Sequence, residues 1–408
     1  MKHSRSRLAA ALGGLLIVTA GAGGGALAGP AEVETHLGSA VAAQLNGDFG
    51  AAAKAFESAL TAAKDFNPGD PRLGEIFHGL AVAHRSAGKL KEAEPYFKLA
   101  LIVREQILGP EHLDVAATLT ELSEFHRLRG SSAEALEAAQ RALQIREGLL
   151  GDRHMAVADS HGQLATLYMK GGDIPSAERH AEQALSVLEQ ALRPDHPDVA
   201  GAIDRLAQVY RFSGRYDEAE SLLQRSLEIR QKANGRYSLG MLPSLDNLAA
   251  LYRDQNRLDE AAAFYEEALA FRAEPPGAPL PEVAQSLDNL AGVYSDQGRS
   301  NSARELYGEA LILRRKALGT EHPEVAVSLD HLARLHYQEG RVQDAEALIV
   351  QALGIRESAL GASHPDLLQN LDDYASLMRA TGRPDEALRL EARARAIRAS
   401  QEALNQPR

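Results

Sequence analysis

PDHPDVAGAIDRLAQVYRFSGRYDEAESLLQRSLEIRQKANG, residues 194–235, contains two segments in which apolar residues recur at helical spacing, one on each side of Gly214. We interpret this stretch as two amphipathic helices with Gly214 at the bend between them. The same pattern recurs with a period of ~42 residues through most of the chain. A fixed period of this length predicts stacked helix pairs rather than one large core.

The bend position is the most regular feature of the repeat. Gly or Asn suits the left-handed backbone that ends one helix before the next begins. We number each repeat from this bend residue, so that columns before it carry a minus sign and columns after it a plus sign. The bends are Gly47, Gly88, Gly130, Gly172, Gly214, Asn256, Gly298, Gly340 and Gly382, evenly spaced except that the first two are one position closer together.

Further columns recur in register with the bend. Ala stands at column +5 in all nine repeats, from Ala52 to Ala387, as expected where two helices approach closely. Leu stands at column −8 in seven repeats, and Tyr at column −4 in four repeats. These larger side chains are predicted to fill the space between the helices of a pair.

The columns resemble the tetratricopeptide repeat, which has Leu, a small residue and Tyr in its first helix and two Ala, seven positions apart, in its second. The resemblance covers residues ~32–401. The period of ~42 residues exceeds the usual ~34 of that family. The longer unit and the SLDNLA type of segment at 244–249 and 286–291 resemble the kinesin light chain subclass.

The predicted fold is therefore an all-α, right-handed α-solenoid of about nine helix-turn-helix repeats over residues 29–401, followed by a loose tail at 402–408. Polar Glu391 and Arg395 in the last repeat are typical of a capping unit. Residues 273–281 carry four prolines and are predicted to form a stiff surface loop, with a hinge or partner contact as the alternative. The expected repeats span about 32–69, 70–109, 110–151, 152–193, 194–235, 236–277, 278–319, 320–361 and 362–401.

Residues 1–28 form a separate segment. Lys2, Arg5 and Arg7 precede an uncharged run that ends in Ala26-Leu27-Ala28. This pattern predicts a signal peptide cleaved after Ala28 and an exported, periplasmic or secreted protein. The alternative is an uncleaved membrane anchor, since the run is about long enough to span a bilayer.

Composition narrows the chemistry. The chain has no Cys, which excludes disulfides, thiol catalysis and cysteine zinc sites. Residues 1–28 carry three basic residues and no acid, so their removal changes the net charge from −12 to −15. Such an acidic chain disfavours nucleic acid and anionic membranes as partners, and no later segment is apolar enough to span a bilayer. The catalytic motifs GxSxG and HExxH and a phosphate-binding loop are absent from the sequence, so we expect neither catalysis nor a cofactor.

His-Pro pairs recur at His196-Pro197, His322-Pro323 and His364-Pro365, each followed by an acid. Pro at the first helical position and an acid in the first turn indicate helix starts. A ladder of metal sites is the alternative, but successive histidines are one repeat apart and lack a converging second ligand. We expect no metal.

The first helix of each repeat is predicted to line the concave side of the superhelix. By helical phase we expect columns −10, −9, −6, −3 and −2 to face this groove. In kinesin light chain-like repeats, Asn residues just before the Leu-Ala pair hold the backbone of an extended peptide, and Asn247 and Asn289 match that position. The predicted groove residues are Asp204, Arg211, Asp246, Asn247, Arg253, Asp288, Asn289, Asp330, His331, Arg334 and Tyr337.

These observations predict a non-enzymatic scaffold that binds proteins or extended peptides, with the carboxylate row favouring partners that carry Lys or Arg. In the alternative interpretation, the Asp and Arg side chains pair with one another across neighbouring repeats and bind nothing. Two other functions remain open: a membrane-tethered assembly factor, and an enzyme that uses the solenoid as a substrate cleft.

Overall fold

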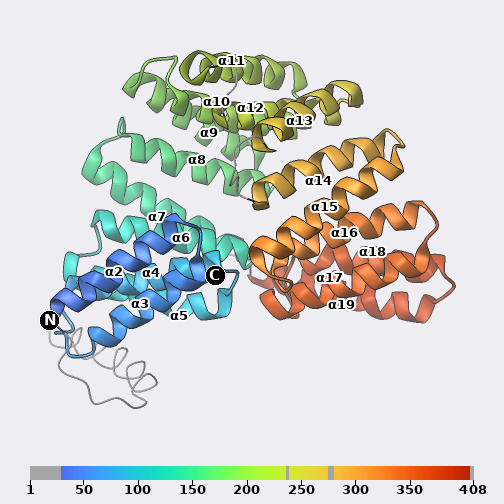
Figure 1. The fold of residues 1–408 in the computed structure, drawn as a ribbon. Helices are drawn as coiled ribbons and strands as arrows, with labels where there is room; N and C mark the ends of the chain where they lie inside the picture. The colour runs from blue at the N-terminus through green and yellow to red at the C-terminus, as the bar shows by residue number, and fades with distance from the viewer. Residues whose placement is uncertain (1–28, 236–238, 274–279, 405–408) are drawn as a thin grey trace. The chain divides into compact units, whose positions relative to one another are not determined.

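The computed structural model describes residues 29–235, 239–273 and 280–404. The predicted leader at 1–28, most of the proline-rich junction and residues 405–408 lie outside this range. Within it the chain is helical and contains no strand. Figure 1 shows the helices in antiparallel pairs. Nine pairs follow one another in the described ranges, from α2 to α19, which confirms the predicted all-α solenoid of helix pairs.

Two compact units divide the chain. Unit 1 comprises residues up to 129 and 134–149, and unit 2 comprises 130–133 and 150 onward. The helices that lie wholly or mostly in unit 1 are α2 Pro30–Leu45, α3 Phe49–Ala62, α4 Pro71–Ser86, α5 Leu90–Leu108, α6 Leu113–Leu128 and α7 Ser132–Leu150. Those of unit 2 are α8 Met155–Lys170, α9 Ile174–Ala191, α10 Pro197–Phe212, α11 Tyr216–Asn234, η1 Leu239–Met241, α12 Leu242–Asp254, α13 Leu258–Ala273, α14 Leu280–Asp296, α15 Ser300–Leu318, α16 Pro323–Gln338, α17 Val342–Leu360, α18 Leu367–Ala380 and α19 Pro384–Leu404.

The bend residues adopt the predicted left-handed backbone. The eight bend glycines have φ between 72° and 80°, and Asn256 has φ 59°. At Gly214 the turn closes with two backbone bonds: Gly214 N–H donates to the Arg211 carbonyl, and Arg215 N–H donates to the Tyr210 carbonyl. The turn satisfies carbonyl groups at the end of the first helix and reverses the chain.

Small residues let the two helices of each pair approach closely. All nine Ala side chains of column +5 are fully buried. Leu206, Leu248 and Leu290 of column −8 are also buried, as predicted. Each repeat therefore packs a short Ala position of its second helix against the larger side chains of its first.

Histidine side chains begin several first helices. The Nδ1 atoms of His112, His154, His196 and His322 each accept the backbone N–H two positions further on, at 3.1–3.2 Å. This is the N-cap role that Ser or Asp has in other helices. The helix starts predicted at Pro197 and Pro323 are confirmed, and the cap itself is the histidine, which the sequence interpretation had not assigned.

The last repeat departs from two predictions. His364 accepts the Asp366 N–H in the same way, but α18 begins only at Leu367, so Pro365 is not its first residue. The prediction of a helix start at Pro365 is therefore wrong by two positions. At the end of the chain, α19 runs to Leu404 and so enters the segment predicted to be a tail.

Candidate binding surface

The carboxylates of column −10 are paired with arginines rather than free. Each contacts an Arg at column +16, in the second helix of the same repeat. The N–O distance is 2.6 Å for Arg230–Asp204 and for Arg272–Asp246, and 2.5 Å for Arg356–Asp330 and Arg398–Asp372, and Arg314 contacts Asp288 in the same way.

A third polar residue joins four of these five contacts. Arg230 donates to Ser244 Oγ at 2.6 Å, and Arg314 donates to Ser328 Oγ at 2.5 Å. Arg272 donates to Ser286, and Arg356 donates to Asn370, which holds the equivalent position. These third residues lie in the first helix of the next repeat, so the Arg connects two repeats. We call this recurring set the Asp–Arg–Ser ladder; its rungs are Asp204/Arg230/Ser244, Asp246/Arg272/Ser286, Asp288/Arg314/Ser328 and Asp330/Arg356/Asn370.

The prediction that column −10 faces an open groove is therefore wrong for its buried members. Asp204 is 5% exposed and Asp288 is 3% exposed. Their side chains turn toward the second helix of the same repeat, one position from the apolar column −11, and a buried carboxylate requires a charged partner. Burial raises the pKa of Asp204 and of Asp330 even though Arg230 and Arg356 act in the opposite direction. The predicted alternative, pairing of Asp and Arg across neighbouring repeats, is met only in part: the Asp residues do pair with Arg, but with an Arg from the second helix of the same repeat.

The two predicted Asn residues lie on first helices α12 and α14 and are half-buried. Gln208 Nε2 donates to Asn247 Oδ1 at 3.1 Å, and Gln285 Nε2 donates to Asn289 Oδ1 at 2.9 Å. These bonds fix the oxygen of each amide. Within the described residues, the amide NH₂ groups of Asn247 and Asn289 have no hydrogen-bond acceptor.

The predicted Arg residues of column −3 pair with acids of the following repeat. Arg211 lies 3.3 Å from Asp254, and Arg253 lies 2.6 Å from Asp296. Arg253 crosses so close to α14 that a Cβ atom at Gly292 would stand 2.9 Å from its guanidinium. The paired side chains are 23–45% exposed. At this exposure each pair contributes about 0–1 kcal/mol.

Helix α16 carries the remaining predicted residues. His331 is half-buried; its Nδ1 lies 3.6 Å from Asp288 Oδ2, and its ring lies 5.1 Å from that of Tyr307. Arg334 is exposed, and Tyr337 is 44% exposed. Neither of these two side chains forms a hydrogen bond or ion pair with the residues that the structure describes. We define the first-helix surface as Asn247, Asn289, His331, Arg334 and Tyr337.

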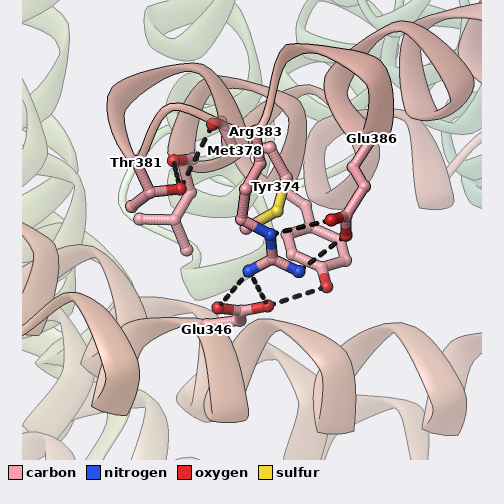
Figure 2. Close-up of polar contacts among 7 residues, drawn as sticks. Glu346, Tyr374, Met378, Thr381, Arg383 and Glu386 are labelled. Carbon is pink, nitrogen blue, oxygen red and sulfur yellow. Dashed lines mark hydrogen bonds and ion pairs between the residues drawn. The ribbon is translucent and has the colours of Figure 1, made fainter.

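A second recurring polar cluster occupies the turns. Figure 2 shows Arg383, the residue after the last bend, between Glu346 of the preceding repeat and Glu386 of its own. The Tyr374 hydroxyl donates to the same Glu346 carboxylate at 3.2 Å. Hydrogen bonds to Glu386 and Glu346 raise the pKa of Arg383. We call this arrangement the turn cluster; it recurs as Arg215 with Glu178 and Glu218, and as Arg257 with Glu220 and Glu260.

Sequence reasoning missed both networks, although each has a signal. Arg stands at column +16 wherever Asp stands at column −10 from the fifth repeat onward, and Arg at column +1 is often followed by an acid at column +4. The described part of the chain contains no cluster of three or more residues suited to hold a metal ion. A search of the same part found no helix both long enough and apolar enough to cross a bilayer.

Comparison with known proteins gives a family and a fold. A tetratricopeptide repeat model matches residues 31–106, 72–148, 114–190, 198–274, 282–358 and 332–400. No curated protein matches the chain. Among solved structures, BtubC (BKLC) from P. vanneervenii is 28% identical over 58% of this chain and 92% of its own, with a TM-score of 0.47. Repeats of a protein described as a kinesin light chain, from Podosopora anserina, are 28% identical over 50% of this chain and 97% of their own, with a TM-score of 0.42.

A third structure extends over more of the chain. The Rap protein complexed with Competence and Sporulation Factor covers 92% of this chain and 99% of its own, with a TM-score of 0.56 and 14% identity. That likeness shows the fold. The family-model matches run from residue 31 to residue 400 with only short gaps, in register with the helix pairs. The chain belongs to the tetratricopeptide repeat family.

Proposed function

We propose that this protein is an interaction scaffold that holds an extended peptide segment of its partner along the first-helix surface of unit 2. The observation that carries the proposal is the set of polar groups left unpaired, among the described residues, on first helices α12, α14 and α16. The carboxylates of column −10 are engaged in the ladder, whereas the amide NH₂ groups of Asn247 and Asn289 and the side chains of Arg334 and Tyr337 are not.

Chemistry and spacing both suit a peptide backbone. An amide NH₂ donates to a backbone carbonyl whatever the peptide sequence. Neighbouring packed helices are about 8–10 Å apart, and an extended chain advances about 3.3 Å per residue. Where successive first helices pack against each other, as α14 and α16 do, one carbonyl in about every three residues of the peptide would therefore meet the next first helix.

The ladder changes the expected charge of the ligand. Because Arg side chains neutralise Asp204, Asp246, Asp288 and Asp330, this column no longer supports a preference for Lys or Arg in the partner. The exposed Arg334 instead favours hydrogen-bond acceptors in the ligand. We further propose that the scaffold acts after export, on the basis of the leader-like residues 1–28.

Peptide display tests the proposal. Random-sequence dodecapeptides would be selected on the purified protein, and their affinity measured by fluorescence anisotropy. We expect Asn247→Ala with Asn289→Ala to weaken binding about 10-fold or more, since each lost hydrogen bond is worth about 0.5–1.5 kcal/mol. Gln351→Ala removes an exposed amide from second helix α17 and is the matched control. Equal affinity of the double variant and the control would remove the first-helix surface from the proposal.

A further inference from the structure

The turn of the seventh repeat lacks the acids that hold its Arg elsewhere. Arg299 occupies the position of Arg257 and Arg383, immediately after the bend. The positions of the two acids are occupied by Ser302 and Ala262. Throughout the described ranges 29–235, 239–273 and 280–404, no carboxylate lies within ion-pair distance of Arg299.

The remaining contacts of Arg299 hold it in place without neutralising it. Its guanidinium lies over the Tyr294 ring, 3.6 Å from the ring centre, as Arg257 lies over Tyr252 at 4.1 Å. It also donates to Gln297 Oε1 at 3.4 Å, as Arg257 donates to Gln255 at 2.9 Å. Arg257 in the sixth turn and Arg299 in the seventh are therefore positioned alike, but only Arg257 is paired with carboxylates.

The nearby tyrosine hydroxyl shows the same difference. Tyr252 donates to Glu220 at 2.9 Å, and that carboxylate also accepts from Arg257. Tyr294 donates instead to Glu266 at 2.7 Å, a carboxylate that forms no ion pair with Arg299. In the seventh turn Tyr294 therefore donates to an acid at a different position, whereas Arg299 has no carboxylate partner among the described residues.

Arg299 borders an open hollow between two neighbouring turns. The hollow has a volume of about 500 Å³ and is lined by Asn256, Leu258, Asp259, Gln297 and Arg299. Asp259 accepts a hydrogen bond from Gln297 Nε2 at 2.9 Å, so the Gln297 amide bridges the carboxylate and the guanidinium. The hollow thus presents one cation and one anion that do not pair with each other.

We propose that this hollow binds an acidic side chain, Asp or Glu, of a partner protein, and that Arg299 receives from the partner the carboxylate that other turns supply internally. A guanidinium offers a fork of donors that matches a carboxylate. Backbone N–H groups of the same partner segment donate to Asp259. Arg299 is preorganised by Tyr294 and Gln297, so little side-chain freedom is lost when the acid arrives. The site uses turns rather than the first-helix surface and is independent of the function proposed above.

The test restores the missing acid within the chain. Ser302→Glu places a carboxylate where Glu218, Glu260 and Glu386 hold their Arg residues, whereas Ser302→Gln has the same shape without the charge. Ser302 is half-buried in the first turn of α15, where other repeats accommodate Glu, so both variants should fold; circular dichroism checks this. The probe is a library of random dodecapeptides with blocked C-termini, selected on each purified variant and sequenced.

We expect wild type and Ser302→Gln to enrich Asp or Glu at one peptide position at least 3-fold over the unselected library. Ser302→Glu and Arg299→Gln should lose this enrichment. Enrichment that appears only when the library has free C-termini would assign the site to a terminal carboxylate and overturn the proposal of an acidic side chain. The proposal is also overturned when wild type shows no acidic preference, or when Ser302→Glu retains it. Asn247→Ala with Asn289→Ala should leave the enrichment unchanged, so failure of the first-helix surface is distinguishable from failure of this site.

Discussion

Removing Asp288 should destabilise the protein far more than removing the equivalent acid of the last repeat. The side chains of Asp288 and Arg314 are each 1% exposed, those of Asp330 and Arg356 are 12% and 11% exposed, and those of Asp372 and Arg398 are 42% and 46% exposed. One helical position therefore offers three burial states of the same ion pair within one chain. The chemistry of the pair is constant while its desolvation varies.

The expected magnitudes follow from burial. Asp288→Ala leaves the Arg314 guanidinium buried with only Ser328, Gln285 and a more distant Glu324 as partners. Loss of one member of a buried pair costs about 3–5 kcal/mol. Asp372→Ala removes an exposed pair and should cost about 0–1 kcal/mol. Asp330→Ala should fall between them.

Hydrogen exchange is the appropriate assay because a repeat array need not unfold as one unit. We expect Asp288→Ala to speed exchange of backbone amides in α14–α16 by about 100-fold or more, which corresponds to about 3 kcal/mol. Asp288→Leu with Arg314→Met should recover much of the loss, because no unpaired charge is then buried. Equal effects of Asp288→Ala and Asp372→Ala would refute the view that burial, rather than the pair itself, sets the cost.

Three further predictions address packing, pH and export. Ala219→Phe should lower the free energy of unfolding by about 1–3 kcal/mol, because Ala219 is fully buried where two helices meet; urea unfolding followed by circular dichroism measures this, and a neutral result would contradict the packing. Burial lowers the pKa of His78 to about 3 and of His180 to about 4, so the unfolded chain binds more protons than the folded one below pH ~6.5. Stability should therefore fall as pH drops from ~6.5 toward 4, by up to about 1.4 kcal/mol per pH unit for each His, and His180→Gln should reduce this slope in urea unfolding at several pH values. The exported protein should begin at Gly29 by mass spectrometry, and a mature chain that retains Lys2 would contradict cleavage.

The periodic part of the sequence predicted the fold well, for a physical reason. The columns of Ala219 and Leu206 recur because every repeat packs its two helices against each other in the same way. A residue type that recurs at a fixed spacing can be recognised in a single sequence. Asn256 could be assigned to the bend because Asn is one of the few residues that adopt positive φ at small cost. Positions that depend only on packing within one repeat were therefore predictable.

The prediction for column −10 failed because helical phase alone does not decide burial of a charged residue. Asp204 and Asp288 lie at the edge of the buried stripe, where the outcome depends on a partner in the other helix of the pair. A charge at such an edge turns inward when an Arg from the second helix is available to neutralise it. Arg104 and Arg146 hold the partner position in unit 1 without an Asp; Arg104 there donates to Thr118 Oγ1 at 2.8 Å, and Arg146 donates to Thr120 Oγ1 at 2.9 Å. Arg at column +16 therefore occurs in more repeats than Asp at column −10, and Asp at column −10 occurs only in repeats that also have this Arg.

Comparing equivalent polar residues between repeats also indicates where a partner is expected to bind. A polar group that recurs with its partner in each repeat is explained by the stability of the array, as Arg257 and Glu260 are. A polar group whose recurring partner is missing in one repeat is not explained in that way. Arg299, without the acids of the turn cluster, is such a group, and Arg334 is a polar residue at a column that is not Arg in the other repeats and has no described partner. Departures from the period therefore indicate contacts with something outside the chain better than the repeated columns do, and we expect the binding partner at Arg299 and the first-helix surface rather than at the Asp–Arg–Ser ladder.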